Sequence, residues 1–74
     1  MAFRIEFIDG PDKGSATVIN PRMGAIIGRS PTANVLVRDH GVSRAHCQIR
    51  CEEGRCVIQD LGSTNGTFVN DQRI

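Results

Sequence analysis

The sequence predicts an all-β fold, a sandwich of two β-sheets with short connecting loops and no substantial helix. Three observations lead to this prediction. Apolar and polar residues alternate in several short segments, which is the period of a half-buried strand. Gly, Pro and Asn separate these segments, and no stretch has the period of a helix. With 74 residues the chain is one domain at most, short for a sandwich that usually needs about 100 residues.

Four candidate strands occur in the first half of the chain. Residues 3–7 alternate between apolar and charged side chains, and the turn sequence Gly-Pro-Asp-Lys-Gly follows at 10–14. We interpret this turn as a hairpin rather than a phosphate-binding loop, because it has no Gly-Lys-Ser/Thr and no helical pattern follows it. The other strands are expected at 16–19, 25–27 and 35–37, with turns or loops at 20–24, 30–34 and 38–42.

A β-hairpin around residues 52–55 is the clearest local prediction. It follows an alternating segment that begins at Ala45, and its turn places Glu52 opposite Arg55, a pair of opposite charge. A one-residue slip would exchange the core face for the solvent face. The same register pairs Cys51 with Cys56 and Ile49 with Ile58 on the core face, and leaves the other face to Gln48, Arg50, Val57 and Gln59. A strand at 67–69 and a turn at 70–72 follow, and the chain stops at Ile74, where another strand should start.

Charge and composition argue against several classes of partner. Lys and Arg number 9 against 8 acidic residues, and this net charge of +1 is too small to hold a nucleic-acid backbone. No apolar run is long enough to span a bilayer, and the N-terminus lacks the apolar region of a signal peptide, so we expect no membrane association. We therefore expect a cytoplasmic protein.

All the basic residues except Lys13 are Arg, whose planar fork of donors matches a phosphate.

The cysteines favour the same compartment. Cys47, Cys51 and Cys56 are an odd number without a paired framework, which is typical of a reducing environment. We expect Cys51 and Cys56 to face each other as reduced thiols, at a spacing that also permits a disulfide. A metal site that adds His40 and His46 is disfavoured, because the cysteine spacing lacks the C-x₂-C pair of common zinc folds. We expect no metal and no other cofactor.

Three motifs occur in a fixed order along the chain. Gly28-Arg29 comes first, then Ser43-Arg44-Ala45-His46, then residues 60–70, which read Asp-Leu-Gly-Ser-Thr-Asn-Gly-Thr-Phe-Val-Asn. Their order and spacing resemble the forkhead-associated (FHA) domain, a β-sandwich of the FHA/SMAD type. The resemblance covers the whole chain, residues 1–74. Because the family continues through further strands that close the sandwich, the chain looks truncated at its C-terminal end.

The resemblance implies a signalling module that binds a phosphothreonine-containing segment of a partner protein and has no catalytic residues. A phosphothreonine carries about −1.5 to −2 charge and three acceptor oxygens, so several donors are needed. By similarity these donors are Arg29, Ser43 and Arg44. Gly28 and His46 are implied to support the site, with His46 bracing the binding loops.

The third motif is implied to hold the peptide main chain. Asn65 is suited to this, because a carboxamide can donate to a carbonyl and accept from an amide, and Thr64 and Gly66 flank it. An alternative interpretation of Asn65-Gly66 is a tight turn with positive φ, in which Asn and Gly are favoured because their backbones adopt this conformation and not because they bind a ligand. We expect further selectivity from the loops at 30–34 and 38–42, where Arg38 and His40 would favour an acidic residue downstream of the phosphothreonine.

Two other functions are possible for a chain with these residues. A hydrolase built from Ser43, His46 and Asp60 is disfavoured, because Ser43 and His46 start on opposite faces of a strand-like segment and there is no G-x-S-x-G elbow. A phosphate-independent protein–protein scaffold of the same fold is the stronger alternative, although it would not require Arg29, Ser43 and Asn65. The absent closing strands also predict an uncovered sheet edge and self-association.

Overall fold

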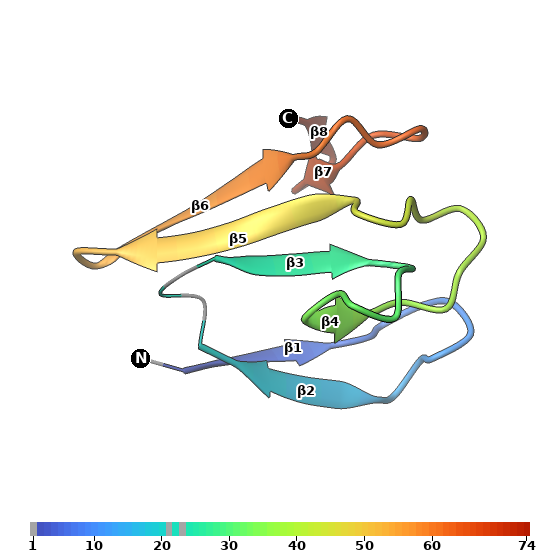
Figure 1. Cartoon of the computed structure of the whole chain (residues 1–74), viewed down its shortest axis with the longest axis horizontal. Coiled ribbons are helices and arrows are strands. Elements are labelled where there is room, and N and C mark those ends of the chain that lie inside the picture. The colour runs from blue at the N-terminus through green and yellow to red at the C-terminus, as the bar shows by residue number, and fades with distance from the viewer. Residues whose placement is uncertain (1, 21, 23) are drawn as a thin grey trace.

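The structure is a computed structural model that describes residues 2–20, 22 and 24–74 (Figure 1). These residues form eight β-strands and no α-helix, so the prediction of an all-β fold is confirmed. A helix long and apolar enough to cross a bilayer is likewise absent from this part of the chain. The strands are β1 (Phe3–Glu6), β2 (Ala16–Ile19), β3 (Ala25–Gly28), β4 (Val35–Leu36), β5 (Cys47–Glu52), β6 (Arg55–Asp60), β7 (Phe68–Val69) and β8 (Gln72–Arg73).

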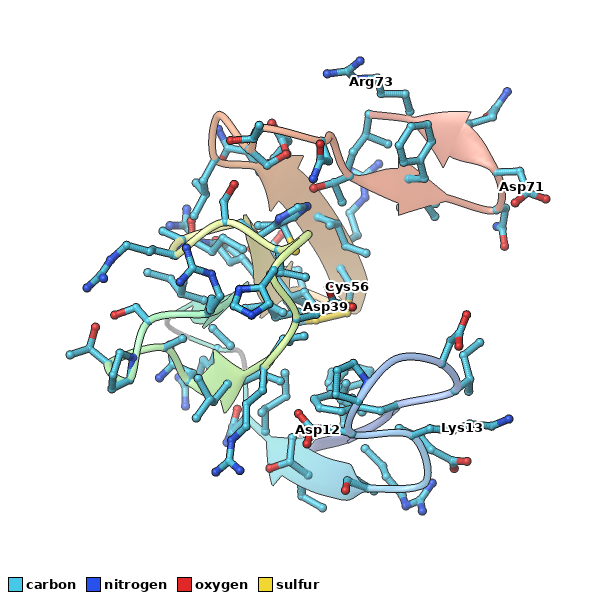
Figure 2. All side chains as sticks on the ribbon, turned by 90° about the vertical axis from the view of Figure 1, so that its right-hand side faces the viewer. Asp12, Lys13, Asp39, Cys56, Asp71 and Arg73 are labelled. Carbon is cyan, nitrogen blue, oxygen red and sulfur yellow. A yellow bond between two sulfur atoms is a disulfide. The ribbon has the colours of Figure 1, made fainter. Side chains whose placement is uncertain are left out.

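The strands are arranged in two layers. The larger layer is a sheet with the order β4-β3-β5-β6, in which β3 and β4 run parallel and the other neighbours run antiparallel. β1–β2 and β7–β8 are separate antiparallel hairpins. Figure 2 shows both hairpins on the same side of the large sheet, where they make the second layer. The sandwich predicted from the sequence is therefore present.

The parallel pairing of β3 with β4 is a feature that the sequence does not predict. Only two residue pairs form it, Ile27 with Val35 and Gly28 with Leu36. The Asn34 side-chain oxygen accepts a hydrogen bond from the Ile26 N–H at 2.8 Å, which satisfies a main-chain donor beside the short ladder. This side chain ties the loop between the two strands back to β3.

The core lies between the β1–β2 hairpin and the β3–β4 half of the large sheet. Ile19 of β2, Ala25 of β3 and Val35 of β4 are buried, and Val35 is only 2% exposed. On β1 the inward residues are half-buried and the charged residues between them are exposed, as the alternation predicts. The partly buried residues packed against this cluster are Phe3, Ile5, Phe7, Ile27, Val37 and Ile49.

The inward face of β6 is open by comparison. Ile49 of β5 is half-buried, but its cross-strand partner Ile58 is 37% exposed, and Cys56 is also exposed. Phe68 of the neighbouring β7 is 58% exposed. The prediction that Cys56 and Ile58 belong to the core is therefore wrong, because the β1–β2 hairpin packs on the other half of the sheet.

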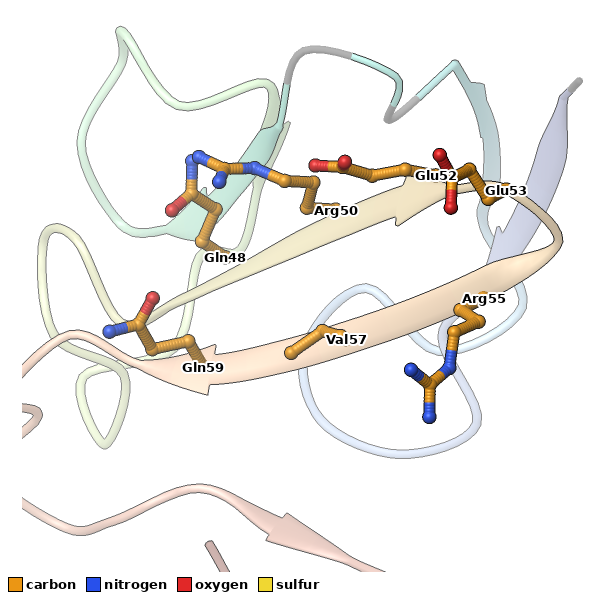
Figure 3. A pocket seen from close by; sticks show the side chains of 7 residues that line it. All are labelled: Gln48, Arg50, Glu52, Glu53, Arg55, Val57 and Gln59. Atoms are coloured by element: carbon orange, nitrogen blue, oxygen red, sulfur yellow. The ribbon is translucent and has the colours of Figure 1, made fainter.

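The β5–β6 hairpin has the predicted register. Glu52 opposes Arg55, and the pairs expected farther along the strands are also formed. Glu53 and Gly54 both have positive φ, 52° and 75°, as in a two-residue type I′ turn. Figure 3 shows the outer face of the hairpin, which carries the predicted set Gln48, Arg50, Val57 and Gln59.

Cys51 and Cys56 face each other as predicted, but the expectation that they are reduced is wrong in this structure. The two sulfurs are joined in a disulfide, with 4.0 Å between the Cα atoms. Directly opposed residues of an antiparallel pair bring their Cβ atoms close enough for this bond. Cys47, the third cysteine, is buried and free.

The remaining predicted elements are found with small shifts. The strand expected from Ala45 begins at Cys47. Of the turn expected at 70–72, Asn70 and Asp71 have positive φ, and β8 begins with the third residue. Pro21 and Met23, which belong to the turn expected at 20–24, lie outside the described residues.

Candidate functional site

Apart from Gly28, the last residue of β3, the predicted site residues lie on loops at one end of the sandwich. Figure 1 shows these loops on the right, opposite the β5–β6 turn, and Figure 2 looks onto them. The Arg38 N–H donates to the Asp12 carboxylate at 3.3 Å, so the β1–β2 loop reaches the β4–β5 loop at this end. The site is therefore built from segments that are distant in sequence.

The loop that follows β3 is held against the segment that precedes β5. The Arg29 N–H donates to the Ser43 carbonyl oxygen (3.0 Å), and the Ser30 N–H donates to that of Arg44 (3.1 Å). The Arg29 Nε donates to the Val42 carbonyl oxygen (3.1 Å), which orients the guanidinium. Its terminal amino groups are not used in this bond, and they are available to an anion.

Arg29 and Arg44 are both exposed. In the described part of the chain the ion pair found joins Arg4 to Glu6, on β1. The charges of Arg29 and Arg44 are thus not neutralised by a carboxylate paired with them among these residues. Two exposed guanidinium groups on neighbouring main-chain segments make a suitable place for a phosphate.

Gly28 makes the close approach of these segments possible. It is buried, and a Cβ on it would lie 2.0 Å from the Arg44 carbonyl oxygen and 3.0 Å from that of Ser43. Main-chain atoms cannot move aside cheaply, so a side chain here would separate the two segments. This contact agrees with the supporting role that the resemblance implies for Gly28, which stays a prediction.

His46 links the second and third motifs. Its Nδ1 accepts a hydrogen bond from the Ser43 N–H (3.0 Å), so Nε2 carries the ring proton and donates to the Gly66 carbonyl oxygen (2.8 Å). Gly66 itself is buried and has a φ of 86°, and a Cβ on it would lie 3.0 Å from the Arg73 Nε. Both residues therefore fix the loop between β6 and β7.

The hydroxyl of Ser43 joins the candidate phosphate site to the candidate peptide site. Its Oγ accepts a hydrogen bond from the Thr64 N–H (3.0 Å), and the hydroxyl hydrogen remains able to donate. The Asn65 Nδ2 donates to the Gly41 carbonyl oxygen (2.9 Å), which leaves its Oδ1 and its second N–H. The structure thus brings Arg29, Ser43, Arg44, Thr64 and Asn65 to one end of the sheet.

Asp60 shapes this loop, and the sign of this role in the sequence is a local turn motif. Its carboxylate accepts hydrogen bonds from the Ser63 N–H and hydroxyl, the Gly62 N–H and the Thr67 hydroxyl. These bonds, that from the Ser63 hydroxyl first and that from Thr67 next, lower the pKa of Asp60 from 3.8 to about 2. The charged carboxylate therefore holds both ends of the β6–β7 loop.

Asp39 does the same for the β4–β5 loop. Its Oδ1 accepts a hydrogen bond from the Gly41 N–H (2.8 Å), and the Gly41 carbonyl oxygen is the one that Asn65 contacts. A local signal for both carboxylates exists in the sequence, because Asp39 and Asp60 each precede a Gly by two residues. Asp in this position commonly bonds the main chain two residues on and closes a turn.

The contacts of Ser43, His46 and Asp60 contradict a hydrolytic triad. Both ring nitrogens of His46 are bound to main-chain groups, and the Ser43 group that reaches it is the N–H rather than the hydroxyl. The Asp60 carboxylate is bound to residues of its own loop. A triad needs the serine hydroxyl and the carboxylate on the imidazole, so these residues have a structural arrangement instead.

A hollow on the outer face of the β5–β6 hairpin is another concave surface (Figure 3). It is lined by residues of both charges, among them Arg50, Arg55, Glu52 and Glu53, and by none of the three motifs. Because opposite charges lie beside one another, this surface does not favour a phosphate. Within the described ranges no three His, Cys, Asp or Glu side chains gather as metal ligands would.

The chain is similar to several known proteins. A family model described as FHA domain matches residues 25–74. A relative from Arabidopsis thaliana, the FHA domain-containing protein At4g14490, is 36% identical over 74 residues, which is 99% of this chain and 19% of that protein. The glycogen accumulation regulator GarA of Mycolicibacterium smegmatis is 38% identical over 66 residues, 88% of this chain and 40% of that protein. The chain thus spans less than half the length of these curated relatives.

Solved structures extend the similarity to the fold. One structure comes from a structural and functional analysis of phosphothreonine-dependent FHA domain interactions. It has a TM-score of 0.85 and 34% identity, and the match covers 100% of this chain and 74% of that one. The FhaA FHA domain, in complex with the intracellular domain of Rv3910, has a TM-score of 0.83 and 34% identity over 100% of this chain and 77% of that one. With the matched family model and the three motifs joined at one end of the sandwich, the chain belongs to the FHA domain family.

Proposed function

We propose that the chain is a binding module that holds a phosphothreonine-containing segment of a partner protein on its loop end and catalyses no reaction. The family supports this assignment, since one solved relative is described by phosphothreonine-dependent interactions and another is bound to an intracellular domain. The exposed guanidinium groups of Arg29 and Arg44 agree with an anionic ligand.

The hydrogen bond from the Thr64 N–H to the Ser43 Oγ carries the proposal most directly. It fixes the loop of Asn65 beside the segment of Ser43 and Arg44, so that one ligand can contact both. It also occupies an acceptor lone pair of Ser43, which leaves the hydroxyl hydrogen for a phosphate oxygen. A phosphorylated residue and the main chain next to it are the ligand that fits these two neighbouring sets of donors.

Arg29 supplies the main contact with the phosphate. Because its Nε is bound to the Val42 carbonyl oxygen, little side-chain freedom is lost when the terminal amino groups bind. Ser43 adds a hydroxyl donor and Arg44 a second charge. Such charge-assisted hydrogen bonds are short and roughly twice as strong as neutral ones, so most of the affinity comes from the phosphate.

The peptide on either side of the phosphate is held by neutral contacts. Asn65 keeps an acceptor and a donor for the peptide main chain, and Thr64 lies beside it. The 38–42 loop adds selectivity, and the exposed Arg38 and His40 favour an acidic residue downstream. Preference for phosphothreonine over phosphoserine requires burial of the γ-methyl group, worth about 0.8 kcal/mol.

One peptide experiment tests the proposal. A phosphothreonine peptide library is applied to the chain, with the unphosphorylated peptides and the phosphoserine peptides as controls. We expect binding only to phosphorylated peptides, tightest with phosphothreonine and with acidic residues downstream. Equal binding of the unphosphorylated peptides would instead support a phosphate-independent scaffold of the same fold.

A further inference from the structure

The disulfide between Cys51 and Cys56 lies outside the proposed binding site. It closes the end of the β5–β6 hairpin that is opposite the site loops in Figure 1, and Figure 2 labels Cys56. The pairing does not depend on the bond, because Cys51 and Cys56 are opposed by the strand register, with the pairs Glu52–Arg55 and Arg50–Val57 on either side. The two sulfurs therefore stay close whether or not they are bonded.

The hairpin is held by more than this bond. Its ladder has six residue pairs, and the turn at Glu53 and Gly54 adopts the positive φ angles of a tight hairpin. The disulfide spans a sequence separation of only 5, and short loops gain the least from a cross-link. Opening the bond should therefore leave the domain folded.

The three cysteines differ in their access to solvent. Cys56 is exposed and Cys51 is half-buried, whereas Cys47 is only 7% exposed. Burial, and next the charge of Asp60, raise the pKa of the Cys47 thiol, which disfavours the reactive thiolate. Cys47 also lies four residues along β5 from Cys51, a distance of about 13 Å in an extended strand. It is therefore a poor competitor for either sulfur of the pair.

We propose that Cys51 and Cys56 form a reversible thiol–disulfide exchange site, which a small thiol such as glutathione opens and a small disulfide closes. Exposed disulfides are the ones that exchange readily. The thiolate of the small thiol attacks the sulfur of the exposed residue Cys56, the S–S bond breaks, and Cys51 leaves as a thiolate that takes up a proton. A second small thiolate then attacks the outer sulfur of the mixed disulfide, and Cys56 leaves as a thiolate. The protein disulfide gains two electrons, and the two small thiols are oxidised to one small disulfide.

Intact mass after alkylation tests this site on the folded chain. The oxidised protein is equilibrated with mixtures of reduced and oxidised glutathione, quenched with acid, and treated with a maleimide before and after denaturation. We expect two thiols to appear together as the mixture becomes more reducing, in the parent and equally in Cys47→Ala. The Cys47 thiol of the parent should react only after denaturation.

A single-cysteine variant identifies the sulfur that is attacked. In Cys51→Ser, Cys56 has no internal partner to displace a bound glutathione, so one glutathione adduct should accumulate under oxidising conditions. The matched variant Cys56→Ser, with the half-buried Cys51, should gain this adduct at least several-fold more slowly. The proposal is overturned if the parent pair stays oxidised in fully reduced glutathione until the protein is denatured, or if Cys47 reacts as fast as the pair.

Discussion

The two ends of the β5–β6 hairpin are stabilised by contacts of different range. At the turn end the contacts are local, since the disulfide and the type I′ turn join residues at most 5 apart in sequence. At the loop end, Thr64 contacts Ser43 over a separation of 21 residues, and Asn65 contacts Gly41 over 24. The turn end therefore depends on the hairpin alone, whereas the loop end requires the whole fold. A binding site at the loop end should be sensitive to changes that the turn end tolerates.

Glycine substitutions at the two ends should give the largest contrast. In Gly28→Ala the new Cβ clashes with the Arg44 carbonyl oxygen, so we expect phosphopeptide binding to be lost. The free energy of unfolding should fall by about 1–3 kcal/mol, the usual cost of adding a methyl group where there is no room for it. In Gly54→Ala the new Cβ meets nothing within 4 Å, and only left-handed strain of roughly 1–2 kcal/mol is expected. Calorimetric titration of both folded variants checks this. Equal affinities would show that the two ends do not differ in this way.

The open inward face of β6 and the exposed apolar residues that follow it should promote self-association. Ile58 of β6, Phe68 of β7 and Ile74 after β8 are exposed apolar residues, and exposed apolar surface next to unpaired strand edges favours pairing with another chain. Light scattering should show an apparent mass that rises with concentration in the parent, and a smaller rise in Phe68→Ser. Val18→Ser, at an exposed position on the β1–β2 hairpin, is the matched control and should behave as the parent. A parent that stays monomeric at every concentration would refute this prediction.

Acid should loosen the loop end through Asp60. The pKa of Asp60 is about 2 in the fold, below its ordinary 3.8, so the charged carboxylate contributes stability above about pH 4. This contribution is lost as the pH falls towards 2. We expect the thermal midpoint of the parent to fall more steeply between pH 5 and about 2 than that of Asp60→Asn, measured by circular dichroism. Parallel curves for the two proteins would contradict the assignment.

The turn end offers a small stabilisation that leaves binding unchanged. Glu53 has a φ of 52°, a conformation that costs most side chains energy and that Asn adopts more easily. Glu53→Asn should raise the free energy of unfolding by about 0.5–1 kcal/mol in a denaturant titration. The affinity for a phosphopeptide should not change, since this turn is remote from the site loops. Destabilisation by this substitution would argue against the type I′ turn.

The same difference in range explains what the sequence predicts well. The strands follow from local alternation, and the hairpin register follows from the charged pair Glu52 and Arg55 beside a Gly-containing turn. By contrast, the parallel β3–β4 pair and the contact of Asn65 with Gly41 depend on which segments meet in space. The site residues could be assembled from sequence only through resemblance to a family, because no periodicity brings Arg29 to Asn65.

The two errors have a physical cause as well. The odd number of cysteines predicts reduced thiols, whereas the register places Cys51 and Cys56 within bonding distance whatever the compartment. Alternation places Cys56 and Ile58 on the same side as Ile49, but this side of β6 is not buried, because a face is buried only where another layer covers it. Period gives the side of a strand on which a residue lies, and burial depends on the partner layer.

The affinity of Arg29→Ala for a phosphothreonine peptide tests the central claim most directly. Isothermal titration compares the affinity of Arg29→Ala with those of the parent, Asn65→Ala and Arg50→Ala. The last of these is a control, because it removes an exposed arginine from the outer face of β5. In Arg29→Ala, loss of the charge-assisted contact should weaken the binding free energy by roughly 2–5 kcal/mol and make the affinity less dependent on salt concentration. Arg50→Ala should bind like the parent. Asn65→Ala should lose about 0.5–1.5 kcal/mol per hydrogen bond and still prefer the phosphorylated peptide. If folded Arg29→Ala binds the phosphopeptide as tightly as the parent does, the phosphate does not bind at this site.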